Sequence, residues 1–225
     1  MSNKIFAIVP AYNEEKNIKK VILSLLKKTS NIIIINDGST DKTKEIVNEI
    51  SSNNKIKTIH IKKNIGKGAA MKKGANLAWK LKADGIIFID ADNQHNIKHF
   101  KDFVKYLKKR EDIIIGIRIM KAKIPFVRRV GNETFSFFMK ILFNIKMQDF
   151  ICGFRALSKK GYKSILWESD GYGVEVETMT IIARKKLPFK TVVVDTIYLD
   201  KYKGFSVWDG IKILFRLPYW RVKKL

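Results

Sequence analysis

The chain has 225 residues, of which 46% are hydrophobic, and a formal net charge of +24. This length and apolar content fit a single folded domain with a sizeable core and exclude a disordered chain. The single cysteine, Cys152, excludes an internal disulfide and a zinc site built on paired cysteines, and no run of about 18 uncharged apolar residues predicts a membrane-spanning helix.

Short apolar segments alternate with helical segments through the first half of the chain. The predicted strands lie at 5–9, 32–35, 56–61, 86–89 and 113–115. The predicted helices lie at 14–28, 41–50, 67–81 and around 100–107. Strands that alternate with helices of about 10 to 15 residues indicate βαβ units, so we expect an α/β fold with a mostly parallel central sheet flanked by helices.

The second half of the chain is less regular. We expect helices at 132–143 and 174–186 and a strand at 191–194. The segment 132–143 is apolar nearly all round, which is typical of a helix that is buried or touches lipid. Residues 207–225 interleave aromatic and basic side chains, which predicts an amphipathic helix on a membrane surface or, equally, a docked helix with a basic tail. No repeat or linker divides the chain, so we predict one domain over residues 1–225.

The positive charge has several possible partners. It fits nucleic acid, phosphorylated small molecules or anionic lipid headgroups. Much of it is lysine scattered over the predicted helix faces, as at Lys27-Lys28 and Lys72-Lys73. Such scatter is more typical of a solvated surface than of a binding site.

Polar residues follow three of the predicted strands, at 10–14, 36–41 and 90–94. Because the carboxyl ends of parallel strands meet at one edge of a sheet, these loops predict a nucleotide site there. Asp90 and Asp92 are two residues apart, which suits a hard divalent cation shared with substrate phosphates. Alone, this pair fits an Asp-rich turn equally well. The three loops together favour the ligand site.

Other nucleotide and catalytic signatures are missing. Gly66-Lys67-Gly68 lacks the third glycine of the dinucleotide fingerprint, and no phosphate-loop pattern occurs. Of the three histidines only His95 lies near the acidic loop, and we expect it to support the site rather than to catalyse.

Six motifs in order resemble a known family. They are VPAYNE, NDGSTD, Asn64-x-Gly-Lys-Gly-Ala, DADNQ, Gly116-x-Arg118, and Asp149 followed by CGFR at 152–155. The set resembles the inverting nucleotide-sugar glycosyltransferases of family 2, and is most similar to the dolichyl-phosphate mannose synthase group. This resemblance implies a GT-A type, Rossmann-like fold. It also implies a nucleoside diphosphate sugar donor, GDP-mannose or a UDP-sugar, bound with Mg²⁺ or Mn²⁺.

The resemblance also implies roles for individual residues. The donor-binding residues would be Pro10, Tyr12, Glu14, Asp37, Lys67, Asp90, Ala91 and Arg118. Asp92 and Gln94 would hold the metal, which neutralises the diphosphate leaving group. The catalytic residues would be Asp92, Arg118, Arg129 and Lys201, with Arg118 as a phosphate clamp and Arg128 or Arg129 on the acceptor phosphate.

One loop departs from the family pattern. The family's late loop usually carries an arginine after its tyrosine and a basic residue after its Gly-x-Ser, whereas residues 198–207 of this chain offer Lys201 and Lys203 instead. Lysine supplies charge without the bidentate fork, so the phosphate geometry differs and mannose is less firmly implied. UDP-glucose and UDP-N-acetylglucosamine stay open as donors.

The acceptor implied by the resemblance is a polyprenyl or dolichyl phosphate, which is already anionic and needs no strong base. We therefore expect an enzyme that is cytoplasmic and peripheral on the cytoplasmic face of the cell membrane. A family 2 enzyme with a saccharide or other non-lipid acceptor is the alternative, and would need a carboxylate base such as Glu133 or Asp149. A nucleic-acid-binding α/β protein would explain the charge but not the acidic loops, so we expect no specific nucleic acid partner.

Overall fold

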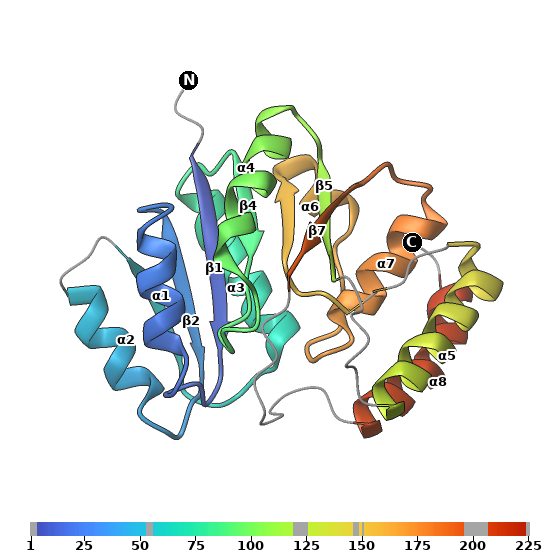
Figure 1. Cartoon of the computed structure of the whole chain (residues 1–225), viewed down its shortest axis with the longest axis horizontal. Coiled ribbons are helices and arrows are strands. Elements are labelled where there is room, and N and C mark those ends of the chain that lie inside the picture. Colours follow the sequence, from blue (N-terminus) through green and yellow to red (C-terminus); the bar gives the residue numbers. More distant parts are fainter. Residues whose placement is uncertain are drawn as a thin grey trace.

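The computed structural model describes residues 4–52, 56–118, 126–145, 149, 151–195 and 207–223. Its central sheet has seven strands in the order β3-β2-β1-β4-β6-β5-β7 (Figure 1). The strands are β1 (Ile5–Ala11), β2 (Ile32–Asp37), β3 (Lys57–Ile61), β4 (Gly85–Phe88), β5 (Ile113–Arg118), β6 (Arg155–Ser158) and β7 (Lys190–Val194). All six predicted strands are present.

The sheet is mostly parallel, which confirms the α/β prediction. Parallel pairs join β1 to β2 and β4, β2 to β3, and β5 to β7. β6 runs antiparallel to both β4 and β5 and was not predicted. The ends of β1, β2 and β4 therefore meet at one edge, as the loop argument requires.

The helices cover both faces of the sheet. They are α1 (Ile18–Leu26), α2 (Thr43–Ser52), α3 (Lys67–Lys80), α4 (Phe100–Lys108), α5 (Phe126–Phe143), α6 (Lys159–Ser164), α7 (Val174–Arg184) and α8 (Val207–Val222), with a 3₁₀ turn η1 (Ile97–His99). α1 begins four residues later than predicted because Glu14 to Asn17 form a turn, in which Glu14 O accepts from the backbone N–H of Asn17. α5 begins six residues earlier than predicted, and α6 was not predicted.

Alternate strand residues enter two cores. Ile33 and Ile35 of β2 pack with α3, α5, α7 and α8 on one face. Ile32 and Ile34 pack with α1, α2 and α4 on the other. A strand buried on both faces reads as a continuous apolar run, which is why these segments are easily recognised in the sequence.

α5 and α8 lie side by side at the end of the molecule away from α1 and α2 (Figure 1). Arg184 of α7 donates to the backbone oxygens of Trp220, at 2.6 Å, and Lys223, and so caps the end of α8. No helix in the described ranges is both long and apolar enough to cross a membrane.

Candidate active site

The loops after β1 and β2 are joined to each other by hydrogen bonds. Asn13 Oδ1 accepts from the backbone N–H of Thr40 at 2.8 Å, and the backbone N–H of Glu14 donates to Thr43 Oγ1 at 2.8 Å. Asn13 adopts φ 55°, a left-handed conformation that asparagine tolerates. This arrangement brings two of the predicted donor loops together and leaves Tyr12 46% exposed beside them.

The Asp37 carboxylate fixes the loop that leads into α3. Its Oδ1 accepts from the backbone N–H of Ile65 at 2.9 Å, while Oδ2 accepts from the N–H of Gly66 at 2.9 Å and from Asn64 Nδ2 at 3.1 Å. Asp37 is 2% exposed. One acceptor position on Oδ1 is outside these bonds. The predicted contact of Asp37 with a nucleoside stays a prediction, and its observed role is to hold residues 64–66.

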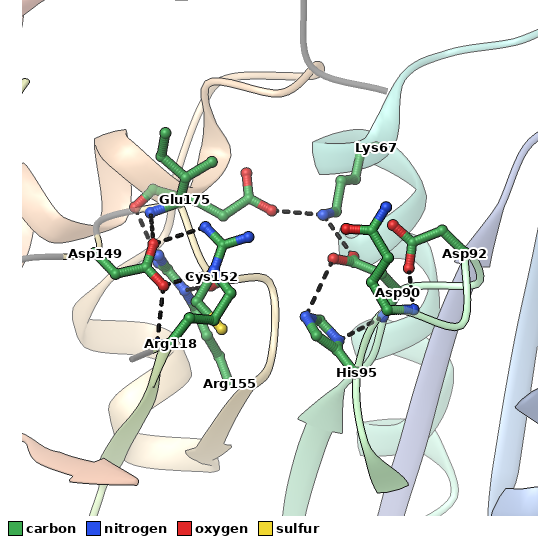
Figure 2. Close-up of polar contacts among 11 residues, drawn as sticks. Lys67, Asp90, Asp92, His95, Arg118, Asp149, Cys152, Arg155 and Glu175 are labelled. Atoms are coloured by element: carbon green, nitrogen blue, oxygen red, sulfur yellow. Dashed lines mark hydrogen bonds and ion pairs between the residues drawn. The ribbon is translucent and has the colours of Figure 1, made fainter. Parts of the chain in front are cut away.

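Lys67 joins two carboxylates from distant parts of the chain, as Figure 2 shows. Its Nζ lies 2.5 Å from Oδ1 of Asp90 and 2.7 Å from Oε1 of Glu175. Lys67 begins α3, Asp90 follows β4 and Glu175 lies in the first turn of α7, so three elements meet at one ammonium group. Burial acts to lower the pKa of Lys67, but the two carboxylates outweigh it and raise the pKa, so Lys67 stays charged.

His95 supports Asp90 from the other side. The backbone N–H of Asp90 donates to Nδ1 of His95 at 3.3 Å, and Nε2 lies 3.6 Å from Oδ2 of the same aspartate. This geometry requires the neutral ring with its proton on Nε2. Burial is the main cause that lowers the pKa of His95; Asp90 and Asp92 oppose it, and the smaller effects of the positive charges on Lys67 and Arg118 add to it. The ring also stacks on Phe154 at 5.2 Å. The predicted supporting role fits this arrangement.

The two aspartates of the acidic loop differ in electrostatics. Burial acts to raise the pKa of Asp90, but Lys67 chiefly outweighs it and holds the pKa at about 2. Burial and the charge of Asp90 raise the pKa of Asp92. A cation beside Asp92 would therefore offset the cost of burying its charge next to that of Asp90.

The donor set of this loop fits Mg²⁺ or Mn²⁺. Asp92 Oδ1 accepts from the backbone N–H of Gln94 at 2.9 Å, which fixes the carboxylate, and Asn93 turns the chain at φ 60°. Among the described residues no three His, Cys, Asp or Glu side chains converge on one point. A metal held by Asp92 and Gln94 would thus take its other ligands from a diphosphate and water, as Mg²⁺ usually does.

Arg118 and Asp149 form a second buried pair. Nε and Nη2 of Arg118 lie 2.7 Å from the two carboxylate oxygens, and the backbone N–H of Arg118 donates to Oδ2 at 3.0 Å. Burial acts to raise the pKa of Asp149, but its bonds with Arg118 outweigh it and lower the pKa. Asp149 is therefore a weak base, whereas Nη1 of Arg118 lies outside the pair.

Two residues without a predicted role complete the site. Arg155 of β6 donates from Nη1 to the backbone oxygen of Glu175 at 2.9 Å and also to Thr178 Oγ1. These bonds fix the first turn of α7. Glu175 could have been noticed in the sequence as a carboxylate between two apolar residues at the start of a predicted helix. Arg155 could have been noticed as the arginine of the CGFR motif.

The glycine of the CGFR motif is explained by its contact with Asp90. A Cβ added to Gly153 would lie 2.4 Å from Oδ2 of Asp90. Only glycine therefore lets this loop approach the acidic loop so closely.

Several predicted residues take no visible part in the site. Ala91 is buried in the core, and Pro10 lies partly buried at the end of β1. The backbone of Arg129 belongs to α5, but its side chain, like those of Arg128 and Glu133, lies outside the described residues, as does Lys201.

Comparison with known proteins identifies the family. Residues 6–166 match the sequence profile of Glycosyl transferase family 2. The chain belongs to this family. The protein is therefore a glycosyltransferase, as the six motifs indicated.

Several similar proteins are named for an activity. The UDP-N-acetylglucosamine–dolichyl-phosphate N-acetylglucosaminyltransferase of Methanococcus voltae is 32% identical and aligns over 98% of this chain and 97% of its own length. The dolichol-phosphate mannosyltransferase of Pyrococcus furiosus is 27% identical and aligns over 96% of this chain and 64% of its own length.

The fold is also shared with a solved structure. Glucosyl-3-phosphoglycerate synthase from Mycobacterium tuberculosis, in complex with Mn²⁺, UDP and phosphoglyceric acid, matches with a TM-score of 0.72. The match covers 100% of this chain and 80% of that chain at 19% identity, so it bears on the fold alone. The predicted GT-A fold is confirmed.

Proposed function

We propose that this glycosyltransferase moves one sugar from a nucleoside diphosphate sugar to a dolichyl or other polyprenyl phosphate, with inversion, at the cytoplasmic face of a membrane. The observation that carries the proposal is the pairing of Asp149 with Arg118. Asp149 is one of the predicted bases, and this pairing makes it too weak a base to activate an acceptor. An acceptor that is already anionic needs no such base. The end-to-end similarity to the dolichyl-phosphate enzyme of Methanococcus voltae supports this acceptor.

On the donor side the chain supplies charges that orient the diphosphate. Asp92 and Gln94 would hold Mg²⁺ or Mn²⁺, which when bound neutralises the leaving group. Lys67 keeps a third N–H beyond its two carboxylates and can donate it to a phosphate oxygen. Asp90, fixed by Lys67 and His95, would contact the donor.

On the acceptor side the phosphate oxygen attacks the anomeric carbon as the bond from that carbon to the diphosphate breaks. No proton has to move in this step. The resemblance implies a donor contact for Arg118. Because its guanidinium pairs with Asp149 and not with the acidic loop (Figure 2), we propose instead that Nη1 contacts the acceptor phosphate, together with Arg129 and Lys201. UDP-N-acetylglucosamine is the first donor to test, because it is the donor named for the Methanococcus voltae relative.

A membrane surface is proposed as the partner of α5 and α8. Trp208 is 72% exposed and Phe215 81% exposed on α8, and Phe137 and Ile141 are exposed on α5. Lys140, Lys212, Arg216 and Arg221 are exposed on the same two helices. Exposed aromatic groups beside basic groups are typical of a helix that lies in the headgroup region of a bilayer.

The transfer assay tests the acceptor. The protein, Mg²⁺ or Mn²⁺, dolichyl phosphate and labelled UDP-N-acetylglucosamine, UDP-glucose or GDP-mannose are incubated, and the lipid is extracted. We expect label in the lipid phase with one donor, and its loss in Asp92→Asn. Label that appears only on added saccharides would favour the non-lipid acceptor and contradict the proposal.

Vesicle sedimentation tests the membrane partner. We expect Trp208→Ser with Phe215→Ser to weaken binding to anionic vesicles by about ten-fold, because two large apolar groups leave the bilayer. Val193→Ser is the control, since Val193 is 53% exposed on β7, away from α8. Equal binding of the double variant and the wild type would exclude this surface.

A further inference from the structure

The Glu175 carboxylate can accept more hydrogen bonds than the described residues donate to it. Its side chain is 2% exposed, and among the described residues the partner of Oε1 is the Lys67 ammonium, at 2.7 Å. Within the described ranges Oε2 has no hydrogen-bond partner. A buried carboxylate oxygen without a partner is rare in native proteins, because an ionised carboxylate accepts several hydrogen bonds. The unused oxygen points to a donor group that arrives with a ligand.

The position of Glu175 indicates which ligand group that is. Figure 2 shows Glu175 reaching toward Lys67, with the pair of Arg118 and Asp149 on one side and the loop of Asp90 on the other. In the proposed reaction the first pair faces the acceptor phosphate, and the loop faces the leaving diphosphate. The sugar must lie between those two phosphates during the transfer. A side chain between the two clusters therefore faces the sugar.

The chemistry of the pair also suits a sugar. A sugar hydroxyl or amide N–H donates, so it pairs well with a carboxylate oxygen that has no other donor. Glu175 supplies this acceptor through Oε2, while Lys67 holds its Oε1. Arg155 holds the backbone oxygen of Glu175 at 2.9 Å, so the carboxylate is fixed before any ligand binds. Such a fixed site loses little conformational freedom on binding.

We propose that Glu175 is a specificity-determining residue whose Oε2 accepts a hydrogen bond from a hydroxyl or amide N–H of the transferred sugar. This inference rests on the proposed function, because it takes the donor to be a nucleotide sugar. Glu175 is distinct from the residues that hold the diphosphate, so it acts on the sugar and not on the nucleotide.

Calorimetry with paired ligands tests the inference. The affinities of UDP and UDP-N-acetylglucosamine, and of GDP and GDP-mannose, are measured with Mg²⁺ for the wild type and Glu175→Gln. For the pair that binds the wild type, we expect Glu175→Gln to weaken the nucleotide sugar about ten-fold or more, since a hydrogen bond to a charged group is lost. The affinity for the bare nucleotide should change less than about two-fold.

A control and a second variant separate this role from a structural one. Glu177→Gln alters a buried carboxylate that accepts from the backbone N–H groups of Glu168 and Ser169. It should leave the affinity for the nucleotide sugar, relative to that for the bare nucleotide, unchanged. Glu175→Asp keeps the charge beside Lys67 but shortens the side chain by one methylene, and should lower this relative affinity as Glu175→Gln does. It carries the test if Glu175→Gln does not fold.

The outcomes are distinct. Equal weakening of nucleotide and nucleotide sugar would make Glu175 a structural support of Lys67 and overturn the inference alone. An unchanged nucleotide-sugar affinity would overturn it as well. If neither pair binds the wild type, the proposed function fails and the inference fails with it.

Discussion

The ammonium of Lys67 is the best place to test the electrostatics of the site. Lys67→Met keeps most of the side-chain length and leaves the buried carboxylates of Asp90 and Glu175 without their shared partner. Removing one member of a buried ion pair costs about 3–5 kcal/mol, and we expect that loss in the free energy of unfolding near pH 7. The pKa of Asp90 agrees in scale, since a fall from 3.8 to about 2 corresponds to about 2 kcal/mol.

The loss should depend on pH in a defined direction. In the wild type the pKa of Asp90 is lowered, so its contribution is present above the ordinary value of 3.8 and is lost as the pH falls toward about 2. In Lys67→Met burial raises this pKa with its main opposing charge gone. The variant therefore regains stability as Asp90 takes up a proton, and the difference from the wild type shrinks between about pH 7 and pH 4.

Urea unfolding followed by tryptophan fluorescence measures this difference. Lys72→Met is the control, because Lys72 lies on the same helix but its Nζ is 3.4 Å from the exposed Asp170. It should cost less than about 1 kcal/mol, with no trend in pH. A Lys67→Met loss below about 1 kcal/mol, or one that stays constant across this pH range, would refute the electrostatic reasoning.

Two further variants test a close contact in the site and the cap of α8. Gly153→Ala places a methyl group 2.4 Å from Oδ2 of Asp90, so we expect donor affinity by calorimetry to fall about ten-fold or more; Gly171→Ala, with nothing within 4 Å, should bind as the wild type does. Arg184→Ala leaves the backbone oxygens of Trp220 and Lys223 without their cap. The free energy of opening α8, measured by amide hydrogen exchange, should fall by about 1–3 kcal/mol, so these amides exchange faster. Unchanged exchange in α8 would contradict that role for Arg184.

The strands could be predicted because the sheet is buried on both faces. A segment such as Ile32 to Ile35 must be apolar at every position. A helix at the protein surface needs apolar residues on one face only. β6 escaped prediction because Arg155–Ser158 contains only two apolar residues. Its arginine is buried through hydrogen bonds that include Glu175 O and Thr178 Oγ1, about 20 residues away in sequence, which no local pattern reveals.

The same distinction applies to the site. The acidic loop could be predicted, because Asp90 and Asp92 follow a strand directly. The pairing of Arg118 with Asp149 and of Lys67 with Glu175 could not, because each partner comes from a different element and the fold alone brings them together. The use of Asp37 to hold Ile65 and Gly66 was hidden for the same reason.

The central claim is that the acceptor is an anionic phosphate that needs no base. The most direct measurement compares transfer of the same labelled sugar to dolichyl phosphate and to dolichol, which differ only in the phosphate group. The account predicts label on dolichyl phosphate and none on dolichol, because Asp149 is held by Arg118 and cannot activate an alcohol. Comparable transfer to dolichol would contradict it.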